Sequence, residues 1–182
     1  MPEPHVALLR GINVGGRNKL RMKDLVAIFE DTGCRDVRTY IQSGNVVFQA
    51  TSALAERVGT EVPRRIAEGF GLRAPVIIRT TKEFRDTVKR HPFVAEARDP
   101  THLHIGFLAD VPHPESVASL DPARSDVDSF AVLGKAVFLY VPGGMARTKL
   151  TTDYFDRRLG TVMTVRNWRT VNTLVEMIGT GG

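Results

Sequence analysis

Residues 39–48 read TYIQSGNVVF, and this stretch decides the fold. Apolar and β-branched residues flank Ser43-Gly44-Asn45, which is a tight-turn signal because Gly and Asn readily adopt hairpin-turn backbone conformations. The pattern predicts two antiparallel strands, at 37–42 and 46–49. Segments with helical periodicity lie on both sides of this hairpin, so the stretch predicts the order βαββαβ.

The segments around the hairpin supply the rest of this order. A strand and a helix are expected before it and a helix and a strand after it, at 6–10, 22–33, 54–70 and 76–79. Pro63 lies inside the second helical segment and predicts a kink or a restart there. Thr80 and Glu83 have the spacing of a capping box, which predicts that another helix begins at this point.

The second half of the chain repeats the same order. Its expected elements are a strand, a helix, two strands, a helix and a strand, at 103–108, 114–120, 130–133, 137–141, 150–159 and 161–165. A last helix follows, with Asn167 as its N-cap. The sequence therefore predicts an α+β protein of two ferredoxin-like halves in tandem, 1–93 and 94–182, with antiparallel sheets and a C-terminal helix.

A glycine-rich loop follows the first predicted strand, where residues 9–19 read LRGINVGGRNK. Glycines let a backbone expose its N–H groups to a ligand, and this loop also offers cationic and amide side chains. The candidate ligand-binding residues here are Arg10, Asn13, Gly15, Gly16 and Lys19. Arginine and asparagine stand where a Walker A loop needs Lys and Ser/Thr, which argues against a P-loop. The alternative is a surface connection whose glycines satisfy only backbone geometry.

Two further polar segments are candidates for the same site. Strand alternation predicts Tyr40 and Gln42 on one face, close to Asn45, although turn chemistry alone explains the Ser-Gly-Asn sequence. Arg166 and Asn167 stand at the start of the last helix, where free N–H groups attract anions, although a capped helix is the simpler interpretation. We expect these residues to meet the loop and Lys149 at the junction of the halves.

Several motifs together resemble one family. The longest are LRGINVGG at 9–16, TYIQSGNVVF at 39–48 and TVRNW at 164–168, and HPF at 91–93 and TKL at 148–150 also fit. The chain in this respect resembles the bacterial family called domain of unknown function 1697. Thr148 stands where that pattern usually has serine, which preserves a hydroxyl. The resemblance implies a protein of this size without targeting signals, and it implies no particular activity.

Composition excludes some classes of protein. The chain has 182 residues, 42% of them hydrophobic, and no apolar run near the roughly 20 residues of a membrane span. The N-terminus lacks the regions of a signal peptide, and Cys34 is the single cysteine, so we expect a cytoplasmic protein without an internal disulfide. His102 and His104 alternate onto one strand face, but no further ligands have metal-site spacing. We expect neither a metal nor a cofactor.

The net charge of +5 leaves three functions open. The leading hypothesis is that the protein binds a small phosphorylated or carboxylated ligand, with catalysis undecided because no catalytic residue is identifiable. The second is binding of RNA or single-stranded DNA, which ranks lower because the expected central strands lack the stacking aromatic residues of RNA-recognition sheets. The third is a non-enzymatic module that contacts a protein partner. The oligomeric state stays open.

Overall fold

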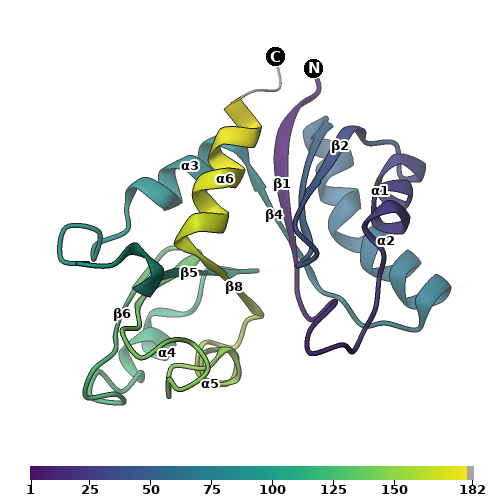
Figure 1. Ribbon diagram of the computed structural model, residues 1–182. Helices are drawn as coiled ribbons and strands as arrows, with labels where there is room; N and C mark the ends of the chain where they lie inside the picture. Colours follow the sequence, from purple (N-terminus) through teal and green to yellow (C-terminus); the bar gives the residue numbers. More distant parts are fainter. Residues whose placement is uncertain (180–182) are drawn as a thin grey trace. The chain divides into compact units, whose positions relative to one another are not determined.

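The computed structural model describes residues 1–179, which divide into two units (Figure 1). The first unit contains Met1–Arg85 and residues 174–179, and the second contains Asp86–Thr173. Each unit has one four-stranded antiparallel sheet with helices, which is the α+β composition expected from the sequence. The sequence-based division into the halves 1–93 and 94–182 stays a prediction.

The first sheet has the strand order β2-β3-β1-β4. Its strands are β1 (Glu3–Leu9), β2 (Arg35–Tyr40), β3 (Asn45–Ala50) and β4 (Val76–Thr80), connected by α1 (Met22–Asp31) and α2 (Ser52–Phe70). Alternate residues such as Ala7, Leu9 and Phe48 pack in one core with the two helices. The rings of Phe29 and Phe48 meet edge to face, with centroids 5.2 Å apart. Period-2 alternation in the strands and i, i+3, i+4 spacing in the helices thus create this core.

The second sheet has the equivalent order, β6-β7-β5-β8. Its strands are β5 (Leu103–Leu108), β6 (Ser129–Leu133), β7 (Ala136–Tyr140) and β8 (Met163–Asn167), connected by α4 (Pro114–Ala118) and α5 (Thr152–Leu159). A short 3-10 helix, η1 (Pro100–His102), precedes β5. Val137 and Leu139 of β7 pack in one core with Tyr154 and Phe155 of α5. Gly160 ends α5 in the left-handed conformation, with φ of +67°, as its position predicts.

The last strand of each sheet leads directly into a capped helix, α3 (Thr81–Lys89) or α6 (Trp168–Gly179). The backbone N–H of Glu83 donates to Thr80 Oγ1 at 3.2 Å, and the Thr80 N–H donates to Glu83 Oε2 at 2.9 Å. The predicted capping box is therefore confirmed. At α6 the Thr170 N–H donates to Asn167 Oδ1 at 2.8 Å, which confirms Asn167 as the N-cap.

The two sheets also match at one arginine on the edge strand that pairs with β1 or β5. Arg79 of β4 lies opposite Val6 of β1, and Arg166 of β8 lies opposite Ile105 of β5. Both arginines are buried, and both donate through Nη1 to the preceding residue's carbonyl oxygen, at 2.8 and 2.9 Å. The repeat inferred from element order thus extends to the hydrogen bonds of individual side chains.

The sequence predicts a kink or a restart of the second helix at Pro63, and the structure excludes the restart. α2 runs from Ser52 to Phe70 as one helix with Pro63 inside it. Val58, Val62 and Ile66 are fully buried in the core of the first unit. Their packing offsets the hydrogen bond that the proline cannot donate, because helices in proteins are stabilised mainly by tertiary contacts.

Several predicted boundaries also need correction, and three of them bear on the turns and caps. β2 ends at Tyr40 rather than at residue 42, because Ile41 has a φ of +48° and residues 41–44 form a turn. α4 stops at Ala118, two residues earlier than expected. β8 is Met163–Asn167 rather than 161–165, so the strand continues up to the N-cap of α6.

Candidate functional site

The glycine-rich loop folds into a small closed turn after β1. The Arg17 N–H donates to the Val14 carbonyl at 2.9 Å, across Gly15 and Gly16, whose φ values are +56° and +75°. Positive φ at both central positions defines a type I′ turn, which explains the glycine pair. The Asn13 N–H closes the next ring by donating to the Asn18 carbonyl at 3.0 Å. The turn is not followed directly by a helix, since α1 begins at Met22.

Asn13 fixes this loop to its surroundings. Its Nδ2 donates to the carbonyl oxygens of Leu20 and Gln42, at 2.8 and 2.9 Å, and its Oδ1 accepts from the Leu20 N–H at 2.9 Å. Both hydrogens of the amide are therefore used inside the protein. Asn13 holds the loop, the start of α1 and the β2–β3 turn in register, which makes it a positioning residue.

A cavity of about 260 Å³ lies beside the loop within the first unit. It is lined by Asn13, Gly16, Lys19, Leu20, Arg21 and Gln42. Four of these residues, all but Leu20 and Arg21, are among those predicted from the sequence. Two cationic side chains, Lys19 and Arg21, line the cavity, and Arg21 is also the N-cap residue of α1, a helix end that no side chain caps.

Arg21 is a lining residue that sequence reasoning missed. Its guanidinium is 70% exposed and binds Asp24, with Nε 2.6 Å from Oδ2 and Nη2 3.0 Å from Oδ1. The hydrogen bond and the charge of Asp24 raise the pKa of Arg21 above its ordinary value. Lys19, also exposed, has no hydrogen bond or ion pair within the described chain. A basic residue directly before a predicted helix was the available signal for Arg21.

The other residues predicted for the site in the first unit do not line this cavity. The Arg10 N–H donates to the Pro75 carbonyl at 3.0 Å, and Asn45, fully buried, donates through Nδ2 to the Tyr40 carbonyl at 3.2 Å. Gly15 lies in the turn and does not line the cavity. The predicted common face of Tyr40 and Gln42 is wrong, because β2 ends at Tyr40 and Gln42 belongs to the turn.

Lys149, Arg166 and Asn167 belong to the second unit. Arg166 is 8% exposed and donates through Nη1 to Thr164 Oγ1 at 2.8 Å, and burial lowers the pKa of its guanidinium to about 10. Asn167 caps α6, and the Lys149 carbonyl accepts from Arg124 Nε at 2.8 Å. A site that unites these residues with the glycine-rich loop stays a prediction.

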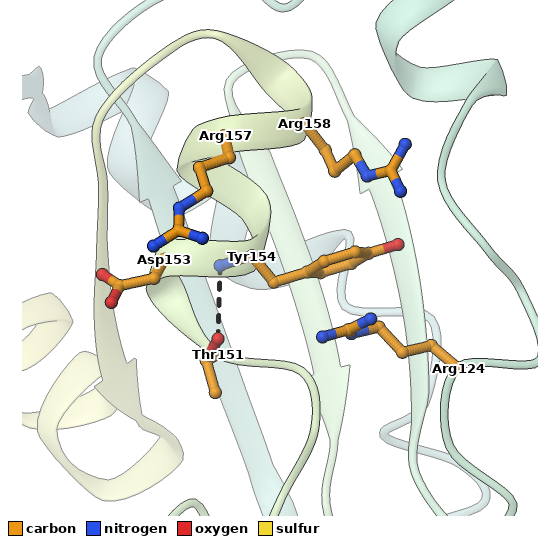
Figure 2. A pocket seen from close by; sticks show the side chains of 6 residues that line it. All are labelled: Arg124, Thr151, Asp153, Tyr154, Arg157 and Arg158. Atoms are coloured by element: carbon orange, nitrogen blue, oxygen red, sulfur yellow. Dashed lines mark hydrogen bonds between the residues drawn. The ribbon is translucent and has the colours of Figure 1, made fainter.

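A larger cavity, of about 500 Å³, lies within the second unit and was not predicted (Figure 2). It is lined by Arg124, Thr151, Asp153, Tyr154, Arg157 and Arg158. The Arg124 guanidinium carbon lies 3.8 Å from the centroid of the Tyr154 ring. Arg157 and Arg158 are adjacent in the sequence, but Arg124 is about thirty residues away, so no motif connects them.

Thiol and metal chemistry find no support in the described residues. Cys34 is 5% exposed, and burial raises the pKa of its thiol to about 11, so it is protonated at neutral pH and a poor nucleophile. Within residues 1–179 no three His, Cys, Asp or Glu side chains gather as metal ligands. The same part of the chain contains no helix with the length and apolarity needed to cross a bilayer.

Comparisons with known proteins bear on family and fold. The model of a family described as "Protein of unknown function (DUF1697)" matches residues 3–138, about three quarters of the chain. No curated protein matches. A solved structure, that of a conserved bacterial protein from Streptococcus pneumoniae, is similar with a TM-score of 0.76 and 21% sequence identity. The similarity covers 99% of this chain and 100% of that one, and at this identity it shows the fold alone.

Proposed function

Because the chain belongs to the family described as protein of unknown function (DUF1697), whose name carries no activity, we propose a function from its own residues. The protein binds a small phosphorylated or carboxylated anion in the cavity beside its glycine-rich loop. The proposal concerns binding and assigns no reaction. The observation that carries it is the convergence of Gly16, Lys19 and Arg21 on one cavity.

The charge of this cavity favours an anion. Lys19 and Arg21 contribute two positive charges, of which Asp24 offsets one through its bond to Arg21. The first turn of α1 adds the partial positive charge of a helix N-terminus, and its N-cap residue, Arg21, provides no side-chain acceptor. Lys19 can therefore donate to a ligand in the same cavity that Arg21, the N-cap residue of α1, also lines.

The size of the cavity limits the ligand. About 260 Å³ is slightly below the volumes of small-molecule sites, which are roughly 300–1,000 Å³. The anionic group itself, such as a phosphate or a small carboxylate, is therefore the part that enters, and the remainder of a larger ligand stays outside. The three hydrogen bonds of the Asn13 side chain hold the cavity wall in place, so this side chain acts by positioning the wall and not by contacting the ligand.

Thermal unfolding in the presence of a ligand panel tests this function. The panel contains inorganic phosphate, sugar phosphates, mononucleotides, small carboxylates and short oligonucleotides, at low and moderate salt. A true ligand at about 100 times its Kd stabilises the fold by roughly 2.7 kcal/mol, or about 5–10 °C for a chain of this size. We expect Lys19→Gln to abolish the shift. Lys89→Gln, which removes an exposed lysine of α3 that does not line the cavity, keeps it.

Two outcomes would contradict the proposed function. One is the absence of a shift with every small anion in the panel. The other is a shift that Lys19→Gln and Lys89→Gln reduce equally, which would indicate a general effect of net charge rather than a site.

We further infer that each sheet with its connecting helices is a ferredoxin-like unit. Support comes from the βαββαβ element order of both units and from their matching strand orders, β2-β3-β1-β4 and β6-β7-β5-β8. This fold hosts many unrelated functions, so it adds nothing to the choice of ligand.

We infer a cytoplasmic location as well. Its support is that Cys34 is the single cysteine and has no cysteine partner for an internal disulfide, which suits a reducing compartment. Measurement of the protein in fractionated cells tests this location directly.

A further inference from the structure

We propose that the cavity around Arg124, Arg157 and Arg158 binds a di- or triphosphate group, such as inorganic triphosphate or the phosphate chain of a nucleotide. It is a second anion site, in the second unit, and it shares no residue with the cavity beside the glycine-rich loop. We call it the arginine cavity. Its volume of about 500 Å³ lies within the range of small-molecule sites.

The arginine cavity has an uncompensated positive charge. Three guanidinium groups and one carboxylate, that of Asp153, line it. Among residues 1–179, Arg157 and Arg158 have no ion pair and no side-chain hydrogen bond. The nearby carboxylate of Asp156 accepts from the Met163 N–H at 2.8 Å, which ties it to β8. The cavity thus has the charge of a site whose counter-ions come from outside the chain.

Arg124 is held in position before any ligand arrives. Its Nε donates to the Lys149 carbonyl at 2.8 Å, and its guanidinium lies 3.8 Å from the centroid of the Tyr154 ring. Tyr154 is itself fixed, since it is 8% exposed and its hydroxyl accepts from the Asp121 N–H at 3.0 Å. The terminal amino groups of Arg124 make no hydrogen bond within the described chain and remain as donors. A guanidinium fixed in this way loses little further entropy on binding.

The segments that carry Arg124 and Lys149 are joined by a small polar network. The buried carboxylate of Asp128 accepts from Ser125 Oγ at 2.9 Å and from Thr148 Oγ1 at 2.6 Å. Thr148 Oγ1 in turn accepts from the Leu150 N–H at 3.0 Å. These bonds keep the Arg124 segment against the start of α5, so that the arginines from two distant parts of the sequence border one space.

The arrangement of the arginines favours an extended anion. Arg124 lies against one face of the Tyr154 ring and Arg158 lies on the other side, near the hydroxyl, whereas Arg157 points to the side of Asp153 (Figure 2). Consecutive residues of a helix diverge by about 100°, so Arg157 and Arg158 leave α5 in different directions. Guanidinium groups bind phosphate oxygens in pairs. Two or three linked phosphates present more acceptor oxygens over a longer span than a single phosphate does, which suits arginines that point in different directions.

Isothermal titration of the whole chain with inorganic orthophosphate, pyrophosphate and triphosphate tests this inference. At 0.15 M salt we expect triphosphate to bind in the arginine cavity at least about tenfold more tightly than orthophosphate, since a charged hydrogen bond is worth that much. Arg124→Gln and Arg158→Gln should each weaken triphosphate binding by about tenfold or more. Arg147→Gln removes the same charge from an exposed residue outside the cavity and should leave the affinity unchanged.

A conservative variant separates ligand contact from structural damage. Arg124→Lys keeps the charge but loses the planar group that stacks on Tyr154, so it should fold normally and still weaken triphosphate binding. Thermal unfolding without ligand checks that each variant is folded. Wild-type affinity for triphosphate in folded Arg124→Lys and Arg124→Gln proteins would overturn the inference.

The design also distinguishes this inference from the proposed function. Lys19→Gln should leave triphosphate binding to the arginine cavity intact, because Lys19 lines only the other cavity. If Lys19→Gln abolishes triphosphate binding and the arginine variants do not, the inference fails while the proposed function stands. If orthophosphate and triphosphate bind equally, or only oligonucleotides bind, the assignment of a polyphosphate group to the arginine cavity is also overturned.

Discussion

Gly44 illustrates how a single residue holds the first unit together. Its φ is +74°, and its carbonyl accepts from the Leu9 N–H at 2.8 Å. A Cβ at this position would lie 2.7 Å from Leu9 Cβ and 3.0 Å from Ile12 Cδ1, both in the buried core. The glycine therefore serves two purposes: it allows the left-handed backbone, and it lets the hairpin turn approach β1.

We expect Gly44→Ala to lower the free energy of unfolding by roughly 2–4 kcal/mol, from backbone strain and from overpacking together. Gly134→Ala is the matched control, because Gly134 has a φ of +58° but no atom within 4 Å of its Cβ position. That change should cost only about 1 kcal/mol. Urea unfolding of both variants measures the difference, and equal losses would show that the close approach to Leu9 does not matter.

Two buried histidines make stability depend on pH. His91 is 5% exposed; its Nε2–H donates to the His104 carbonyl at 3.1 Å, and its Nδ1 accepts from the Phe93 N–H at 3.4 Å. Both ring nitrogens are thus used in the neutral form. Burial lowers the pKa of His91 and of His104 below the ordinary histidine value. At pH values between the folded and the unfolded pKa, the unfolded chain therefore binds protons that the folded chain does not bind.

The sign of this linkage predicts that acid destabilises the protein. The contribution of each histidine is complete above the unfolded pKa of about 6.5 and is lost as the pH falls toward the lowered folded pKa. We expect urea unfolding between pH 7.5 and 5 to show a loss of up to about 1.4 kcal/mol per pH unit for each histidine. His91→Gln should flatten this slope, and His113→Asn, at an exposed position, should not. A slope unaffected by His91→Gln would exclude this cause.

At the scale of elements, α6 depends on its N-cap. Asn167 is the last residue of β8, and its Oδ1 accepts from the Thr170 N–H at 2.8 Å. Asn167→Ala should therefore cost about 1 kcal/mol, or roughly 2–4 °C in Tm, whereas Asn167→Asp keeps the acceptor and costs a few tenths at most. Thermal unfolding of the two variants tests the cap. Similar Tm values for both would mean that this bond contributes little.

Helix ends and turns also account for much of what could be predicted at this scale. The capping box of Thr80 and Glu83 and the left-handed Gly160 are interactions between residues a few positions apart. Their formation depends on local geometry, so local sequence suffices to predict them. Pro63 could not be judged in this way, because the cost of a proline in α2 is offset by the distant residues against which that helix packs.

For the whole molecule, the net charge of +5 bears on nucleic-acid binding. The 25 basic residues are balanced by 20 acidic ones, and the basic side chains of the two cavities form small groups rather than a long stripe. We expect a fluorescent single-stranded oligonucleotide to bind weakly at low salt and to be released at about 0.15–0.2 M salt, because such binding arises from counter-ion release. Fluorescence anisotropy measures this. Oligonucleotide binding that persists at this salt concentration would favour the nucleic-acid alternative.

The candidate site was predicted only in part, because some of the residues that line the cavities are far apart in the sequence. Asn13, Gly16, Lys19 and Gln42 line one cavity, and all four come from motifs that stand out in the sequence. Arg21 was missed although it stands directly before a predicted helix; in the structure it lines the cavity and binds Asp24. The pairing of Arg124 with Tyr154 has no sequence signal, since the two residues are thirty positions apart and meet only through packing.

The sequence by itself determined the element order, the turn glycines and the helix caps of this protein, because each depends on backbone preferences and hydrogen bonds among neighbours in the chain. Only the tertiary structure decided where β2 ends, that α2 continues through Pro63, and which cations border a common cavity. Those outcomes depend on contacts between residues far apart in sequence. Their free energies are set by burial and close packing, which a local pattern does not contain.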